Sequence, residues 1–131
     1  MIIIQKAWGF EKVIVNNPLY CGKELHLDLY GLSSLHYHRK KLETFYILSG
    51  LVRLTIDIQS RAANPNPQRS VKIMKPGQSV DIFPMYAHRF YGIDHSVIME
   101  FSTYHDEEDV VRLLPSMAGD PLRKDCDLAP V

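Results

Sequence analysis

Four side chains of the types that bind transition metals are spaced as one site would require. His36 and His38 are two residues apart, Glu43 follows soon after, and His88 lies some fifty residues beyond His38. Residues two apart on a β-strand point to the same face, so the two histidines would present their imidazoles side by side. Glu43 would open the next strand after a turn, and His88 would come from a later strand.

Three neutral imidazoles and one carboxylate form an N3O ligand set that suits first-row divalent ions. The alternative is that these are ordinary polar residues on a solvated strand face, as a lone histidine would be. Two histidines at ligand spacing, a glutamate after the next turn and a third histidine on a distant strand favour the site. The sequence therefore predicts that His36, His38, Glu43 and His88 bind one divalent transition metal, either Mn, Fe, Co, Ni or Zn.

The segments that carry these residues are short, rich in β-forming residues and closed by turn residues. Their rhythm predicts strands at 13–15, 25–30, 44–48, 51–58, 79–83, 88–92 and 96–103. The runs 44–48 and 51–58 flank a tight Ser49-Gly50 turn, so they predict a hairpin. The segment 59–70 is polar and holds two prolines, which predicts a long exposed loop within one domain. Many short strands at this spacing predict an all-β barrel or sandwich.

The C-terminal part of the sequence predicts one short helix from Asp106 to Leu114. The acidic run 106–109 would lie at its first turn, where the helix dipole favours negative charge, although it could also attract a metal or substrate. A chain of 131 residues suits one core and one domain. We expect the barrel to occupy residues 1–115, with the helix and tail of 106–131 packed on it.

The overall composition argues against several function classes. The 15 basic and 15 acidic residues give a formal net charge of zero, which argues against a nucleic-acid partner. The apolar start of the chain is too short for a signal-peptide core, and no run approaches membrane-spanning length. We therefore expect a soluble, cytoplasmic protein with no membrane partner. Cys21 and Cys126 match no metal or redox spacing, and a protein of this size does not need a disulfide between them.

With these residues the sequence resembles the cupin superfamily. The first cupin motif matches at Gly31, His36, His38, Glu43 and Gly50. Its opening gap is one residue short. The second motif matches at Gly77 and His88, but Phe83 and Met85 stand where a proline and a glycine are usual. The resemblance implies a single-domain jelly-roll β-barrel that holds its metal on the histidines and the glutamate named above.

Among cupins the sequence is most similar to sugar-handling members of the D-lyxose isomerase and type II mannose-6-phosphate isomerase kind. The shared features are Trp8-Gly9, Ser34-Leu35 and the strand Glu100-Phe101-Ser102-Thr103. This resemblance implies that Glu100 transfers the proton and that Lys41, two residues before the ligand glutamate, is a second catalytic residue. We also expect Ser34 of the shared Ser-Leu to contact the carbohydrate, and the aromatic side chains of Trp8 and Phe90 to stack on a sugar face.

The chemistry of a metal-dependent aldose–ketose isomerase requires a metal ion and a separate carboxylate, and the sequence offers candidate residues for both. A metal that chelates two sugar oxygens stabilises the developing negative charge, while a separate carboxylate moves one carbon-bound proton. Glu43 would be occupied by the metal, so Glu100 is the best candidate for that carboxylate. The alternatives are that Lys41 is an exposed turn residue, that Glu100 is merely paired, and that the aromatic residues belong to the core.

Three functions stay open on the sequence. The first is a metal-dependent isomerase of a sugar or sugar phosphate, and the second is a non-catalytic cupin that binds carbohydrate. The third is a small oxygenase with Fe(II) in the same ligand set. We also expect a homodimer, because Ile2-Ile3-Ile4 would form an edge strand that a second copy could cover.

Overall fold

The computed structural model describes residues 2–58 and 68–120. Within these ranges the chain forms eleven β-strands and one short 3-10 helix, Glu107–Asp109. The strands are β1 (Ile2–Lys6), β2 (Gly9–Asn16), β3 (Cys21–Leu27), β4 (Leu35–His38), β5 (Glu43–Ser49), β6 (Val52–Ile58), β7 (Gln68–Met74), β8 (Ser79–Ile82), β9 (Tyr86–Gly92), β10 (Ser96–Ser102) and β11 (Val110–Leu114). The all-β prediction is confirmed.

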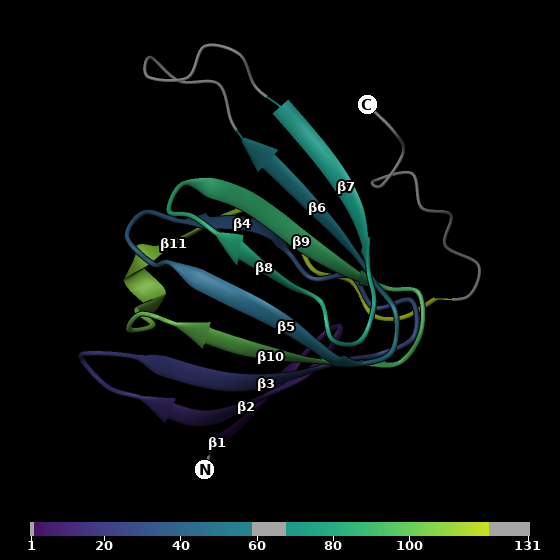
Figure 1. Cartoon of the computed structure of the whole chain (residues 1–131), viewed down its shortest axis with the longest axis horizontal. Coiled ribbons are helices and arrows are strands. Elements are labelled where there is room, and N and C mark those ends of the chain that lie inside the picture. Colours follow the sequence, from purple (N-terminus) through teal and green to yellow (C-terminus); the bar gives the residue numbers. More distant parts are fainter. Residues whose placement is uncertain (1, 59–67, 121–131) are drawn as a thin grey trace.

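The strands form two antiparallel sheets that face each other as two layers (Figure 1). One sheet has six strands in the order β1-β2-β3-β10-β5-β8, and the other has five in the order β11-β4-β9-β6-β7. The chain crosses between the sheets after β3, β4, β5, β7, β8, β9 and β10. Strands that alternate in this way between two packed antiparallel sheets define a jelly roll.

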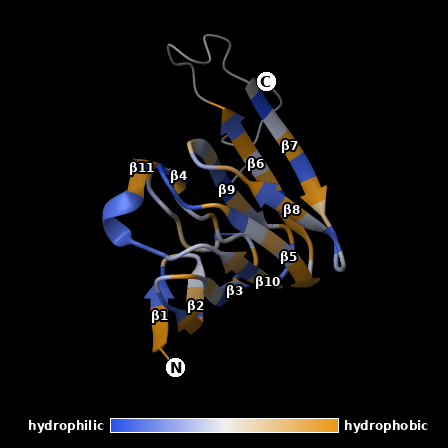
Figure 2. Cartoon of the chain, turned by 60° about the vertical axis from the view of Figure 1, so that its left-hand side comes forward, coloured by the Kyte–Doolittle hydropathy of each residue, from blue (hydrophilic) through white to orange (hydrophobic). Residues whose placement is uncertain are grey.

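The core lies between the sheets because the strands alternate in burial with a period of two. In β3 every second side chain is buried, and β10 follows the same pattern over most of its length. Hydrophilic and hydrophobic residues also alternate along the edge strand β7 (Figure 2), but there Val71 and Ile73 are exposed. The central cluster joins aromatic and aliphatic side chains of both sheets, among them Trp8, Leu27, Phe45, Ile47, Leu54, Phe90 and Ile98.

The predicted hairpin between residues 44–48 and 51–58 is wrong. β5 pairs with β10 and β8, whereas β6 pairs with β7 and β9 in the opposite sheet. The turn between them is a corner at which the chain changes sheets. Gly50 makes the corner with a φ of 93°, and a Cβ there would lie 2.2 Å from Oγ of Ser96. The residue must therefore be glycine both for its conformation and for the close approach of β10.

Two other predictions need correction near the loop and the C-terminal helix. The expected exposed loop 59–70 ends earlier, since Gln68–Met74 form β7, and residues 59–67 lie outside the described ranges. The helix expected from Asp106 to Leu114 is a single 3-10 turn, and Val110–Leu114 continue as β11. Pairing of β11 with β4 explains the difference, because a strand partner outweighs the weak helix propensity of two valines. Cys21 is a buried free thiol, and Cys126 lies outside the described residues.

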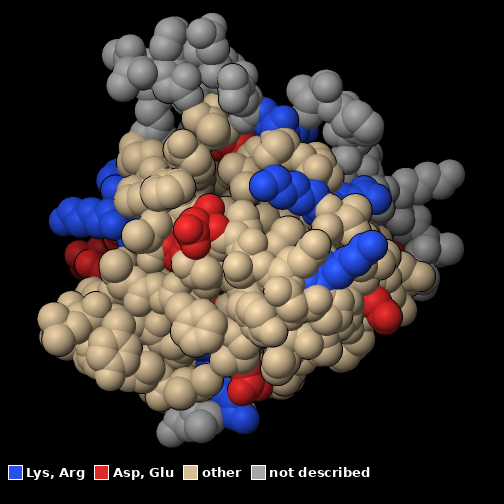
Figure 3. Space-filling model, in the orientation of Figure 1, with Lys and Arg blue, Asp and Glu red and all other residues tan. Residues whose placement is uncertain are grey.

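Charged side chains and exposed apolar strand residues share the surface. No helix among the described residues is long and apolar enough to cross a membrane. On the face seen in Figure 3, charged side chains of both signs are scattered and separated by wide uncharged areas. β1 lies at one edge of the six-stranded sheet, as expected, with Ile2 and Ile3 more than half exposed.

Candidate metal centre

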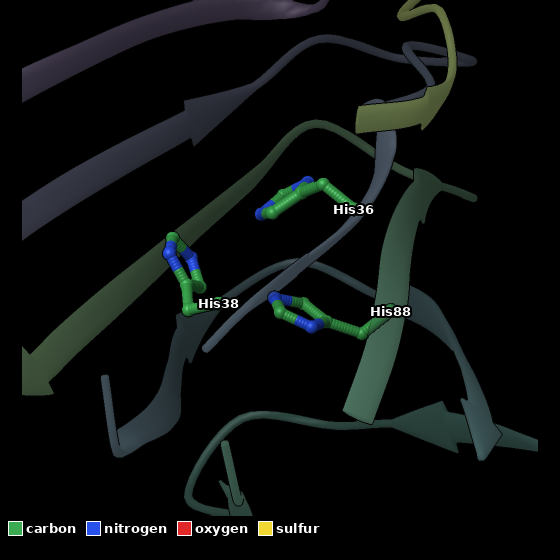
Figure 4. Close-up of side chains that lie close together, drawn as sticks. All are labelled: His36, His38 and His88. Carbon is green, nitrogen blue, oxygen red and sulfur yellow. The ribbon is translucent and has the colours of Figure 1, made fainter. Parts of the chain in front are cut away.

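The three histidines of the predicted site come together on the inner face of the five-stranded sheet. His36 and His38 lie on β4, and His88 lies on β9 directly opposite His36 in the antiparallel ladder. One ring nitrogen of each histidine lies within 4.8 Å of one from each of the other two. Figure 4 shows the rings turned toward one another from the two strands. This spacing could hold a metal ion between them.

Backbone contacts fix which nitrogen of two rings faces the centre. Nδ1 of His36 donates to the carbonyl of Ser34 at 3.0 Å, and Nδ1 of His88 donates to the carbonyl of Tyr86 at 3.1 Å. A carbonyl can only accept, so these contacts place the proton on Nδ1 and leave the Nε2 lone pair free. Hydrogen bonding of the second nitrogen in this way is typical of metal-bound histidines.

Glu43 reaches the same place from the start of β5, in the opposite sheet. Its Oε1 lies 3.3 Å from Nε2 of His38, and its Oε2 lies 3.2 Å from Nε2 of His88. Burial by itself would raise the pKa of Glu43, but the contacts with His38, His88 and Lys41 hold this pKa well below its usual value. The carboxylate is therefore ionised and faces two imidazole nitrogens.

Unpaired buried atoms test whether a cation fits this cluster. Four buried side-chain polar atoms of the described residues have no hydrogen bond, and three belong to the cluster: Nδ1 of His38, Oε2 of Glu43 and Nε2 of His88. Nε2 of His88 and Oε2 of Glu43 thus lie 3.2 Å apart, and neither is satisfied by a hydrogen bond. Buried polar atoms are rarely left in this state, and a divalent cation would satisfy both. The donor set and its unpaired atoms fit a transition metal.

The electrostatics of His36 agree with this arrangement. Burial lowers the pKa of His36 well below its ordinary value, and the neighbouring His88 and His38 lower it further. His36 is therefore neutral near pH 7, which is the form that binds a metal.

A buried ion pair lies beside the histidines. Nζ of Lys41 is 2.7 Å from Oε2 of Glu100 and 3.2 Å from Oε1 of Glu43. Lys41 is only 3% exposed, so it is not the exposed turn residue of the alternative interpretation. Burial opposes its charge, but the two carboxylates raise the pKa of Lys41 above its usual value, so it is an ammonium. The hydroxyl of Ser102 also donates to Oε2 of Glu100, and Oε1 accepts no hydrogen bond from the described residues.

A third partner of Lys41 is His105, the residue just before the segment that was expected to be helical. Nζ of Lys41 donates to Nδ1 of His105 at 2.8 Å, and Nε2 of His105 donates to Glu107 at 2.8 Å. The backbone of His105 is fixed by two hydrogen bonds with the side-chain amide of Asn16. Burial and the charge of Lys41 lower the pKa of His105, which agrees with a neutral ring. The role of His105 as a partner of Lys41 was not predicted from the sequence.

A cavity of about 310 Å³ opens from the metal cluster between the sheets. Trp8, Ser34 and Phe90, expected to contact substrate, all line it. Trp8 and Phe90 also belong to the core cluster. Both Oγ and the carbonyl of Ser34 contact Nδ1 of His36, so this serine orients a ligand histidine. The cavity wall thus brings every sequence-predicted site residue except the deeper His88 to one space.

Sequence analysis missed Lys23, which also lines this cavity. Lys23 lies on the inward face of β3 in phase with Cys21, Leu25 and Leu27, and it is 3% exposed. The sequence predicted that this strand starts at Leu25. Extending the same alternation back to Cys21 would have placed a lysine at a core position, which is an unusual position for a charge.

Met85 occupies the turn before His88 where cupins usually have glycine. Its φ is 76°, in the left-handed region that favours glycine, and its N–H donates to the carbonyl of His38 at 2.6 Å. The departure from the family motif therefore changes the residue but not the turn, and the turn ties β9 to β4 beside the ligands.

Comparisons with known proteins show the fold. No family model and no curated protein matches the sequence. Solved structures do match. KdgF from Halomonas sp. is 12% identical with a TM-score of 0.59 over 76% of this chain and 81% of its own. Oxalate decarboxylase from Bacillus subtilis is 14% identical with a TM-score of 0.70 over 86% of this chain and 30% of its own. CapF is 15% identical with a TM-score of 0.69 over 91% of this chain and 34% of its own.

These neighbours are cupins, and the chain has the cupin fold. It spans only about a third of the oxalate decarboxylase and CapF chains. The more specific resemblance to D-lyxose isomerase and type II mannose-6-phosphate isomerase stays a prediction.

Proposed function

We propose that this chain is a metal-dependent cupin that interconverts an aldose and a ketose, as the free sugar or its phosphate. The observation that carries the proposal is the buried pair of Lys41 and Glu100, set beside a histidine cluster in a cavity that suits a small molecule. Perturbed, charged side chains that converge in a cavity mark candidate active sites.

In this proposal His36, His38, Glu43 and His88 hold the metal, as Mn, Fe, Co, Ni or Zn. When bound, the metal would supply Lewis-acid stabilisation of the substrate oxygens. Glu100 provides the carboxylate that is not a ligand. Its Oε2 is anchored by Lys41 and Ser102, which leaves Oε1 to take the proton from one carbon and return it to the next. Lys41 holds Oε2 of Glu100 in place through their 2.7 Å ion pair.

The substitution Glu100→Gln tests the mechanism. It keeps the size of the side chain but removes the basic oxygen, so we expect turnover to fall at least about a hundredfold while bound metal is retained. Pentoses, hexoses and their phosphates would be screened with added Mn or Co by NMR. Glu24→Gln is the matched control, since Glu24 lies on the adjacent strand with its side chain on the other face. Full turnover by Glu100→Gln would remove Glu100 from the mechanism.

A second candidate is a cupin that binds carbohydrate without turning it over. The ion pair is also compatible with this candidate, because a carboxylate that is already paired with Lys41 is a weaker base. This candidate predicts that a sugar raises the melting temperature while the NMR spectrum of the sugar stays unchanged. Oxygen uptake in the same screen would instead indicate an Fe(II) oxygenase.

A further inference from the structure

The cavity beside the metal cluster holds a second lysine that neither the fold nor the proposed chemistry uses. The ammonium of Lys23 is buried, and its partner among the described residues is Oε1 of Glu11 at 3.4 Å. This distance is long for a charged hydrogen bond, which is usually about 2.7–2.9 Å. A lysine ammonium has three N–H donors, so Lys23 has donors left for a ligand in the cavity.

Lys23 lies close to the residues of the proposed reaction. It is the direct cross-strand partner of Glu100 in the β3–β10 ladder, and both side chains point inward. Directly opposite residues on one face have Cβ atoms about 4.5–5.5 Å apart. Lys23 and His36 both line the same cavity. A ligand that reaches the metal cluster can therefore also reach Lys23.

The charge of the cavity wall supports an anionic ligand. Among the described residues the wall carries four cationic side chains, Lys6, Lys23, Lys41 and Arg112. It carries four carboxylates, Glu11, Glu43, Glu100 and Glu107. These charges cancel, and the imidazoles add none while they are neutral. A divalent metal would leave the cavity with an excess of two positive charges, which favours a negatively charged ligand.

We propose that Lys23 binds the anionic group, a carboxylate or a phosphate, of an acidic carbohydrate whose hydroxyl or carbonyl oxygens face the metal cluster. This inference rests on the proposed metal site and names the substrate class of that site. Glu11 competes with the ligand for Lys23 and holds the ammonium in position when the cavity is empty of ligand.

Binding measurements on the Mn-loaded protein test the inference. Calorimetry with D-glucuronate, D-glucose 6-phosphate and D-glucose compares a carboxylate, a phosphate and a neutral sugar. We expect the wild type to prefer at least one of the acids. Lys23→Met should weaken the binding of that acid about tenfold to a hundredfold, which is the range of a charged hydrogen bond. The affinity for D-glucose and the metal content should stay within about twofold of the wild type. Whichever acid loses affinity identifies the group that Lys23 recognises.

Three further variants guard against a merely structural effect. Lys23→Arg keeps the charge and should retain the preference, and Lys72→Met removes an exposed lysine of β7 and should change nothing. Glu11→Gln removes the competitor and should tighten binding of the acid, a gain that unfolding would not produce. Equal binding of acids and D-glucose by the wild type, or no effect of Lys23→Met and Glu11→Gln, would overturn the inference. If acid binding depends on Lys23 but no sugar is turned over, the role of Lys23 stands and the proposed isomerase function is rejected.

Discussion

His105 connects the buried ion pair to the surface, and its two ring nitrogens have different tasks. Nδ1 accepts from Lys41, and Nε2 donates to Glu107. The ring is therefore expected to be neutral with its proton on Nε2, because an ammonium can only donate. Histidine 15N chemical shifts would show this tautomer directly, and a proton on Nδ1 would contradict the assigned hydrogen bonds.

Two substitutions of His105 separate these tasks. The amide oxygen of His105→Asn can take the place of Nδ1 and accept from Lys41, whereas the longer side chain of His105→Gln places its amide near Nε2. We expect His105→Gln to lower kcat about tenfold, near the free energy of one charged hydrogen bond, and His105→Asn to retain most of it. Metal content is the control and should not change. The same loss of kcat in both variants would show that only the ring shape matters.

At the residue scale the sequence predicted the ligand histidines but not the lysine contacts. His36, His38 and His88 could be found because alternation on a strand and motif spacing bring like residues together. Extending the alternation of β3 would have found Lys23. His105 could not be found, because its partners Lys41 and Asn16 lie far along the chain. Asn16 and His105, for example, are 89 residues apart and share two hydrogen bonds.

At the scale of elements, the segment before β11 acts as a support for the turn that carries Lys41. The carboxylate of Asp109 accepts hydrogen bonds from three successive backbone N–H groups, those of Arg39, Lys40 and Lys41. The same segment provides His105 to the side chain of Lys41. Lys41 is thus fixed at both its backbone and its ammonium by one stretch of chain.

Removal of the Asp109 carboxylate should therefore destabilise the protein. We expect Asp109→Ala to lower the free energy of unfolding by about 1.5–3 kcal/mol, since bonds to a charged group are lost and the N–H groups of this turn lose their acceptor. Asp106→Ala is the matched control, because among residues 2–58 and 68–120 the side chain of Asp106 accepts only from the N–H of Glu108. It should cost no more than about 1 kcal/mol. Urea denaturation measures both, and equal effects would contradict the special role of Asp109.

Sequence patterns predicted most strands but assigned one connection wrongly. The clean alternation of β6 is visible in the sequence, and so is the turn at Gly50. Whether a tight turn pairs its two strands or sends them to opposite sheets depends on the strands that cover them. β5 has β10 and β8 on its two sides, so no edge is left for β6. Local alternation carries no information about those distant partners.

At the scale of the whole molecule, bound metal should stabilise the fold. A ligand present at one hundred times its Kd adds about 2.7 kcal/mol to the free energy of unfolding. In a chain of this size that corresponds to a rise in melting temperature of about 10 °C. Calorimetry with and without Mn or Co measures the rise, and a chelator should reverse it. His36→Gln, which removes one ligand, should abolish most of it.

This stabilisation should depend on pH in a defined direction. Burial opposes protonation of His88, but its contacts with Glu43 outweigh burial, so the pKa of His88 is raised in the metal-free protein. This raised pKa stabilises the metal-free fold below the unfolded value of about 6.5, and the effect disappears as pH rises through the folded value. Metal binding must displace this proton. The increase in melting temperature on metal binding should therefore be larger at about pH 8 than at about pH 6. A smaller increase at the higher pH would contradict the ligand set.

The exposed edge at β1 leads us to propose a homodimer. Ile2, Ile3 and Ile4 are 63%, 56% and 40% exposed, on a strand that pairs on one side only within the described part of the chain. An exposed apolar edge strand is a ready template for pairing with another chain. Light scattering after size exclusion should give twice the monomer mass, and Ile3→Lys should shift it to monomer. A monomeric wild type would reject the proposal.

The short pairing between β4 and β9 determines which part of the molecule should unfold locally first. It contains a single registered pair, His36 opposite His88, whereas β9 has seven such pairs with β6. A cation held by both histidines would act as a cross-link at this one registered pair. Loading would then lock one alignment, since a slip of one residue turns His88 to the opposite face of the sheet. Amide hydrogens of β4 should accordingly exchange much faster after chelation, while those shared by β6 and β9 stay slow.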